Sequence, residues 1–510
     1  MGRINTNVQS LITQRVLGAN NATLSQSLER LSTGLRVNRG KDDPAGIIAG
    51  ESLRAEQKGL NAAIANAERA DQVGNIADGG LQEVASLLTE LQGILTTTAS
   101  RAGLSAEEKS ANQLNIDSIL QTVDRIAGAT NFQGTRLLNG NLDFRVSSIN
   151  AAVSDYRIGA ARFGGASLAV DMLVTASAQQ GGLFLSLGGA SLDLTTGSLL
   201  VLDIAGARGA RELSFSSGTT LAKVRDAINS FTDVTGVAAA VSGTGIKLST
   251  SEFGSAEFVS VRTVNAGGIA SGGSGVHRIR AGNFNAAATI AADGANAETE
   301  FASATNGVRD AGQDIGAVIN GVVATGKGRT ARVSSDFLEA EITIGVSASQ
   351  QVGSVGGAGS ALTIAGGGAE FYLGQKVDVT GSMSIGLQDI GTRALGNNTV
   401  GRLDRLGSGK ANNLISGDLI GAQKIVAEAI AQVSAVRGRL GTFQKNIVGA
   451  TIRSLGIAVE NTAAANSVIR DADFASETAQ LTRSQILVSA STNVLQLANN
   501  APQSALQLLG

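Results

Sequence analysis

The side chains that most often carry chemistry are scarce in this chain. Its 510 residues include no cysteine and a single histidine, His277. The usual zinc sites need several Cys or His ligands, and a Ser-His-Asp triad would have to use His277, although no nucleophile elbow is recognisable in the sequence. We therefore expect no metal, no cofactor and no catalytic residue, and we interpret His277 as a surface or loop residue. Asp and Glu are spread along the chain, which leaves a carboxylate pair for glycoside chemistry open.

One stretch comes close to a phosphate-binding loop. Residues 321–327 read GVVATGK, but Gly328 follows where the motif needs the Ser or Thr that binds magnesium. We interpret this stretch as a glycine turn between strands.

The composition argues against nucleic-acid binding and against a membrane span. The formal net charge is −2 and aromatic residues make up only 3% of the chain, so neither a basic surface nor stacking platforms for nucleic acid are expected. No run of eighteen apolar residues suggests a membrane span. The first residues lack the apolar core of a signal peptide, so we expect any export to occur without a cleaved signal.

Both ends of the chain show helical patterns. Near the N-terminus, leucines step by seven, four, three and four residues, which is a heptad seam; these are Leu17, Leu24, Leu28, Leu31 and Leu35. The run ends at Gly34 and the turn at 38–40. Asp43 is a good N-cap and Pro44 suits the first helical position, so a second helix is expected there. We expect Gly79-Gly80 to interrupt that helix.

The C-terminal part repeats this design. We expect Asp418 to cap a helix with a regular heptad, whose seam comprises Ala429, Val433, Val436, Leu440, Phe443 and Ile447. A break at 470–473 precedes a last helix, predicted from about Phe474 to Asn499 and ended by Pro502. Its seam residues are seven apart: Leu481, Val488 and Leu495.

The middle of the chain has a different character. Over residues 143–400, short β-branched runs alternate with Gly, Ser and Thr, which predicts a β-rich α+β region. Strands are expected at 199–206, 211–215 and 338–347. One helix is expected with Thr220 as its N-cap, and a hairpin is expected to turn at 242–245.

The heptad seams have two possible uses. They could form the core of an intramolecular bundle. However, the terminal segments 4–35 and 474–499 contain few large residues, and such helices are marginal alone. Seams of this kind become ordered when copies of a chain stack head to tail, and such contacts build helical filaments.

Several motifs in order resemble the bacterial flagellins, the family of flagellar filament subunits. In the first 140 residues these are INTNVQSL, SLERLSTGLRVNRGKDDPAG, LNAAIANAERADQVGNIADGGLQEV and NFQGTRLLNG. In the last 110 they are RGRLGTFQKNIVGATIRSL, RDADFASETAQLTRSQIL and NAPQSALQLLG. A stretch at about 197–262 resembles the insert motif shared by some flagellins and hook-associated proteins.

The resemblance implies an architecture that is mainly α at both termini with a β-rich α+β insert. Residues 1–42 with 471–510 would form a terminal coiled coil in the inner filament core. Residues 43–142 with 401–470 would form a second helical layer, and 143–400 an outward-facing insert. The joint between the layers would comprise Arg36, Asn38, Arg39, Lys41, Asp42, Asp43 and Pro44. Charged side chains there, with Arg30, would form either inter-subunit ion pairs or a solvated turn.

The resemblance also implies a structural function in swimming motility. The chain would polymerise with itself, and possibly with other flagellins, into an extracellular filament. It would be exported unfolded through the flagellar channel and fold at the tip. Partners would include the filament cap, the hook–filament junction proteins and an export chaperone. The alternatives are a hook–filament junction protein, which shares the terminal architecture, and an adhesin or enzyme displayed by the insert.

Overall fold

We describe the fold from a computed structural model. It describes residues 6–100, 104–162, 165, 167–269, 274–279, 299–335, 337–357, 360–376, 378, 381–415 and 417–507, with no side-chain description beyond 500. The chain forms two compact units. Unit 1 comprises residues 1–71, 372–381 and 443–510, and unit 2 comprises 72–371 and 382–442. Helical ends and a β-rich middle confirm the predicted fold class.

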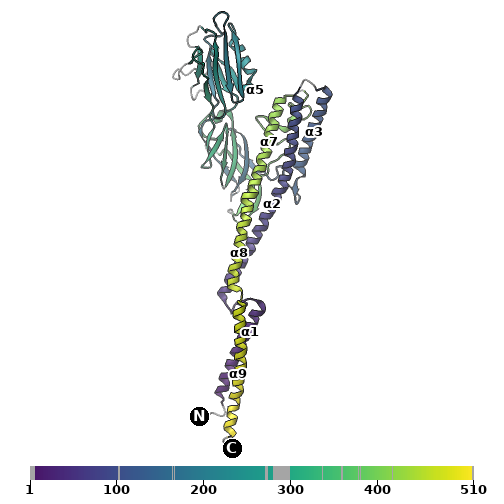
Figure 1. The fold of residues 1–510 in the computed structure, drawn as a ribbon, viewed down its shortest axis with the longest axis vertical. Coiled ribbons are helices and arrows are strands. Elements are labelled where there is room, and N and C mark those ends of the chain that lie inside the picture. Colours follow the sequence, from purple (N-terminus) through teal and green to yellow (C-terminus); the bar gives the residue numbers. More distant parts are fainter. Residues whose placement is uncertain are drawn as a thin grey trace. The chain divides into compact units, whose positions relative to one another are not determined.

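Unit 1 contains the two terminal helices. Helix α1 (Val8–Thr33) lies antiparallel beside α9 (Phe474–Gln507), as Figure 1 shows, because Asn7 meets Ala498 at one end and Arg30 meets Glu477 at the other. Helix α8 (Gly449–Arg470) precedes α9, and a π-helical segment η2 (Phe443–Val448) leads into it. Helix α9 continues through Pro502, so its predicted end was wrong; proline removes one helical hydrogen bond but does not have to end a helix.

Helix α2 (Pro44–Ala99) runs without a break through 56 residues. The predicted interruption at Gly79-Gly80 was therefore wrong. A Cβ at Gly80 would lie 2.8 Å from both Leu138 Cδ1 and Thr130 Oγ1. This glycine permits the chain around the hairpin to approach the helix closely, rather than breaking the helix.

The helices of unit 2 bury their apolar faces. They are the later part of α2, α3 (Ala106–Ala129) and α7 (Leu419–Thr442), which lie beside one another in Figure 1. The 3–4 spacing on α2 becomes one fully covered stripe of Leu81, Val84, Leu88, Leu91 and Leu95. Ser105 and Glu108 form a capping box at the start of α3. The backbone N–H of Ile420 donates to the Asp418 carboxylate at 3.0 Å, so Asp418 caps α7 as predicted.

Two short hairpins and one short helical segment lie beside these helices. The hairpin after α3 is β1 (Asn131–Phe132) with β2 (Thr135–Arg136). The other pairs β24 (Gly396–Asn397) with β25 (Gly401–Arg402) and leads into the 3₁₀ segment η1 (Leu403–Leu406).

Among the described residues, the insert forms three larger antiparallel groups of strands and one small one. The nine-stranded sheet has the order β20 (Gly353–Ser354), β6 (Met172–Ala176), β16 (Gly316–Ile319), β17 (Val322–Lys327), β18 (Thr330–Ser334), β19 (Leu338–Ile344), β4 (Val153–Ala161), β23 (Ser382–Ile385), β22 (Ala369–Tyr372). The small sheet has the order β3 (Phe144–Ser147), β21 (Leu362–Gly367), β5 (Leu168–Val170). Helix α6 (Val346–Ser349) follows β19.

The other two sheets share a second core. One has the order β10 (Val237–Ser242), β11 (Gly245–Thr250), β7 (Gly182–Ser186), β13 (Gly275–Arg278), β14 (Thr299–Glu300). The other has the order β15 (Val308–Ala311), β12 (Phe258–Ala266), β8 (Leu199–Gly206), β9 (Gly209–Ser216). Alternate residues of β8 point inward against helix α4 (Leu221–Asn229), which Thr220 caps as predicted, and α5 (Thr232–Thr235) follows.

Two predictions for the insert, one for His277 and one for residues 321–327, were wrong. His277 is only 2% exposed and lies in β13, with its ring 6.3 Å from that of Phe184. It is therefore a core residue, not a surface or loop residue. The stretch 321–327 is mostly strand β17, and the turns lie at its two ends, where Asn320, Gly321 and Gly328 have positive φ.

Candidate polymerisation surfaces

The contact between α1 and α9 is unusually polar. Its buried positions hold small polar residues and one acid: Ser10, Thr13, Ser27, Glu477, Ser484 and Ser491. The Asn7 amide donates to Ala498 O at 2.7 Å, Ser10 Oγ to Asn499 Oδ1 at 2.7 Å, and Asn20 Nδ2 to Ser491 Oγ at 2.8 Å. These bonds fix the register of the pair, but such an interface buries little hydrocarbon.

The predicted seam leucines are only partly covered by this pair. Half-buried positions are Leu17, Leu24, Leu31, Leu35, Leu481, Val488 and Leu495. Leu28 is 49% exposed and faces away from the pair. The two helices therefore use one side of each seam and leave the other side uncovered in the single chain.

Further apolar residues outside the heptad are exposed on the same helices. On α1 they are Val8, Leu11, Ile12 and Val16, and on α9 they are Phe474, Ile486, Leu487, Val494 and Leu497. Ile486 is 63% and Leu497 72% exposed. Covering one such side chain fully contributes about 1.5–3 kcal/mol. A heptad search misses these residues, whereas the density of Ile, Val and Leu around the whole helix is the signal that could have found them.

The apolar seam of α7 is buried within its own chain. Val433, Val436, Leu440 and Phe443 are all buried. The last predicted position, Ile447, is only half-buried, and Val448 is buried in its place. The π-helical segment η2 is the reason, because each π turn inserts one extra residue and shifts the following face by one position.

Helix α8 and the start of α2 form a second uncovered region in unit 1. Helix α8 has no buried residue, and Ile457 and Val468 are 60% and 80% exposed. Ile48, in the first turns of α2, is 73% exposed. These apolar side chains of α8 and α2 are therefore left largely uncovered in the single chain.

The predicted joint is an ordered structure held by backbone hydrogen bonds. Gly34 ends α1 in the left-handed conformation at φ 70°, and its carbonyl accepts from Ala472 N at 2.9 Å. Arg36 N donates to Arg470 O at 2.6 Å, and its guanidinium donates to Ile469 O at 2.7 Å. The two terminal segments are thus tied together where the helices break.

Charged residues of the joint have partners in the same chain. Arg39 Nε lies 2.9 Å from Glu29 Oε1. The Asp42 carboxylate accepts from the backbone N–H groups of Arg39 and Asn38, and the bond from Arg39 is the main cause that lowers its pKa. Asp43 Oδ1 accepts from Gly46 N at 2.9 Å and caps α2, with Pro44 at the first helical position as expected. Lys41 is exposed.

Within the described part of the chain, no group of three or more His, Cys, Asp or Glu could hold a metal ion. One continuous helical stretch, Leu419–Arg470, is long and apolar enough to cross a membrane. Core helices of soluble proteins have the same length and apolar character. The first half of this stretch, α7, buries a stripe of apolar side chains inside unit 2.

Comparison with known families identifies both ends of the chain. The bacterial flagellin N-terminal helical region matches residues 4–143, and the bacterial flagellin C-terminal helical region matches 423–509. The flagellin hook IN motif matches residues 201–252, which include most of β8 and all of β9, α4, α5, β10 and β11. Together the three regions span more than half of the chain.

Curated relatives match along the full length. Flagellin A of Helicobacter pylori is 28% identical, with 99% of this chain and 98% of that protein covered. The flagellin of Salmonella typhimurium is 29% identical, with 99% of each covered. A crystal structure of the Escherichia coli flagellar cap protein FliD is also similar, at 15% identity over 46% of this chain and 66% of that one, but its TM-score of 0.25 is too low to carry an argument. The chain belongs to the bacterial flagellin family and is a structural subunit of the flagellar filament.

Proposed function

We propose that the apolar residues left exposed on α1, α9 and α8 are the contacts through which subunits join in the filament. The observation that carries this proposal is the polar α1–α9 contact, which leaves Ile486, Val494 and Leu497 uncovered. Neighbouring copies would cover these side chains together with the outer side of the leucine seam. Because each copy presents the same surfaces, repeated heterologous contacts extend into a helical polymer.

The layers of the filament follow the division expected for the family. We assign 1–42 with 471–510 to the inner coiled coil and 43–142 with 401–470 to the surrounding helical layer. The insert at 143–400, including the hook-IN-like unit at about 197–262, would face outward. At the joint, exposed Lys41 and the outer edge of the Arg39–Glu29 pair are the groups placed to form ion pairs with a neighbouring subunit.

Export and assembly partners follow from family membership. We propose that the chain is exported unfolded through the flagellar channel and folds at the tip beneath the filament cap. The hook–filament junction proteins, an export chaperone and other co-assembled flagellins would be its further partners. A chain without cysteine is suited to this route, because it cannot form wrong disulfides outside the cell.

The absence of native cysteine also allows a direct test of the contacts. Single variants Ile486→Cys, Leu497→Cys and Val468→Cys would be labelled with a maleimide in free chains and in filaments. Each should react readily in the free chain and at least tenfold more slowly in the filament. Val323→Cys is the matched control, since Val323 is 79% exposed on β17 of the insert, and it should react equally in both. Equal labelling of all four in the filament would rule these helix faces out as contacts.

A further inference from the structure

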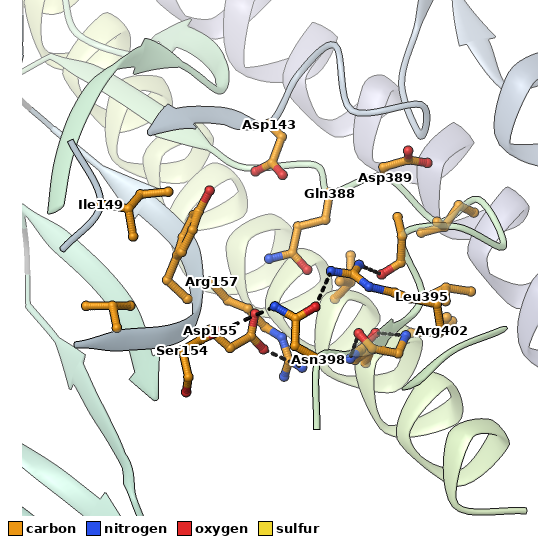
Figure 2. Close-up of a pocket in the computed structure, with 18 residues that line it drawn as sticks. Asp143, Ile149, Ser154, Asp155, Arg157, Gln388, Asp389, Leu395, Asn398 and Arg402 are labelled. Carbon is orange, nitrogen blue, oxygen red and sulfur yellow. Dashed lines mark hydrogen bonds and ion pairs between the residues drawn. The ribbon is translucent and has the colours of Figure 1, made fainter. Parts of the chain in front are cut away.

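A cavity of about 430 Å³ lies within unit 2, between strand β4, the 388–398 loop and helix α7. Its size is that of a small-molecule site. Figure 2 shows its polar side chains in two groups: Asp155, Arg157, Asn398 and Arg402 lie together, and Asp143 and Asp389 lie on the other side of Gln388. The two groups differ in how their hydrogen-bonding capacity is used.

The first group is satisfied by its own neighbours. Arg157 Nη2 lies 2.8 Å from Glu428 Oε1 and 3.8 Å from Asp155 Oδ2. Arg402 donates to Ala394 O at 2.8 Å and to Asn398 Oδ1 at 3.3 Å. Neighbouring protein groups therefore use most of the hydrogen-bonding capacity at this end of the cavity.

The second group keeps unused acceptors. Asp143 accepts only from the N–H of the adjacent Phe144, at 2.8 Å, and Asp389 from Gly391 N, at 2.8 Å. Among the described residues, neither carboxylate makes an ion pair, and neither the Tyr156 hydroxyl nor the Gln388 amide has a hydrogen-bond partner. Figure 2 shows the Asp143 carboxyl pointing toward Gln388.

At this end of the cavity, burial disfavours the ionised forms of Asp143 and Tyr156. Burial is the main cause that raises the pKa of Asp143, and the nearby charge of Asp389 raises it further, while Arg439 and the Phe144 N–H oppose the rise. Burial also raises the pKa of the Tyr156 hydroxyl, and Asp143 and Asp155 add to that effect. Perturbed groups that converge on one cavity are typical of binding sites.

We propose that this cavity binds a small organic cation, with its ammonium group between Asp143, Gln388 and the Tyr156 hydroxyl. An ammonium group supplies up to three donors, which match the acceptor positions that Asp143, Gln388 and the Tyr156 hydroxyl leave unused. Ile149, Ile390 and Leu395 line the same cavity and would contact a short hydrocarbon part of the ligand. A linear alkyl diamine fits both the charge and the volume, and it is the probe for the test. This binding activity lies beyond the filament function.

The test titrates 1,4-diaminobutane into the full-length chain by isothermal calorimetry, with butane-1,4-diol as the neutral isostere. We expect saturable binding of one diamine per chain and no saturable binding of the diol. Asp143→Asn should weaken diamine binding at least tenfold, and Tyr156→Phe should weaken it about threefold to tenfold. Asp193→Asn removes an exposed carboxylate of the insert that lies outside the cavity and should bind like the wild type.

Hydrogen exchange of the wild-type chain provides a readout that does not depend on any variant. Added diamine should protect amides in 153–157 and 388–396 and should leave the hook-IN-like unit unchanged. The proposal is overturned if diamine and diol behave alike, or if neither saturates. It is also overturned if Asp143→Asn and Asp193→Asn bind the diamine equally well.

Discussion

A buried ion pair joins the β-rich part of unit 2 to its helices. Arg157 on β4 contacts Glu428 on α7 at 2.8 Å, and both side chains are about three-quarters covered. Burial by itself would raise the pKa of Glu428, but hydrogen bonds from Arg157 and Gln432 outweigh it, so this pKa lies below its ordinary value. The folded state therefore favours the charged carboxylate, and the pair stabilises the folded chain only where Glu428 is ionised.

The variant Glu428→Gln should lose that stabilisation at neutral pH. We expect a loss of about 1–2 kcal/mol in the free energy of unfolding near pH 7, because a charged hydrogen bond to Arg157 is replaced by a neutral one. Since the folded pKa of Glu428 is lowered, the wild-type advantage should be fully present above the unfolded pKa of about 4.5. It should vanish as the pH falls through the folded value.

Denaturant unfolding of the wild type and variant from pH 3 to pH 8 checks this expectation. Asp226→Asn is the matched control, because Asp226 pairs with Arg225 on the surface and exposed pairs contribute about 0–1 kcal/mol. A difference for Glu428→Gln that is the same at pH 3 and pH 7 would show that ionisation is not the cause.

Sequence patterns do not reveal close approaches between residues distant in the chain. Gly80 looked like a helix breaker because glycine is a poor helix former. Its actual neighbours, Leu138 and Thr130, come from a segment about fifty residues later. His277 was misplaced for the same reason, since its burial depends on β7, β13 and β14 pairing across the insert.

At the scale of elements, the π-helical segment η2 separates two helices that differ in burial. Helix α7 before it is a core helix, and helix α8 after it has no buried residue. The heptad from Ala429 to Phe443 predicted the buried face correctly, because packing follows the helical period. The pattern fails at Ile447, since a one-residue insertion in the backbone is invisible to a count of apolar spacing.

Deleting one residue should distinguish the π segment from an ordinary helix. Asn446 is exposed within η2, so its deletion should convert the π turn to an α turn and keep α7 packed. Ser434 is exposed within α7, but its deletion would rotate Val436 and Leu440 away from the core by about 100°. We expect a loss below about 1.5 kcal/mol for the Asn446 deletion and several kcal/mol for the Ser434 deletion.

Thermal unfolding followed by circular dichroism measures both deletions. A larger loss of stability for the Asn446 deletion than for the Ser434 deletion would contradict the assignment of η2 as a tolerated insertion in the helix.

At the scale of the whole molecule, the sequence predicts the helices at both ends of the chain and their order along it. It does not predict which apolar surfaces of those helices stay exposed. Some signals are local and can be recognised without tertiary information. They are the heptads, the turn at the joint, and the N-caps at Asp43, Ser105 and Asp418. Which apolar side chains a single chain leaves exposed depends on the polar register of α1 against α9, through Asn7, Ser10 and Asn20. No sequence period encodes that register.

The central claim is that the terminal helices are completed by other copies of the chain. Seeded polymerisation tests it most directly: full-length chain is added to sheared filament seeds and followed by light scattering and electron microscopy. A truncated chain without residues 1–35 and 474–510 is run in parallel. We expect long filaments from the full-length chain, and we expect the truncated chain to stay monomeric with the cores of its insert intact. Equal growth by the truncated chain, or a full-length chain that stays monomeric with both ends protected from protease, would contradict the account.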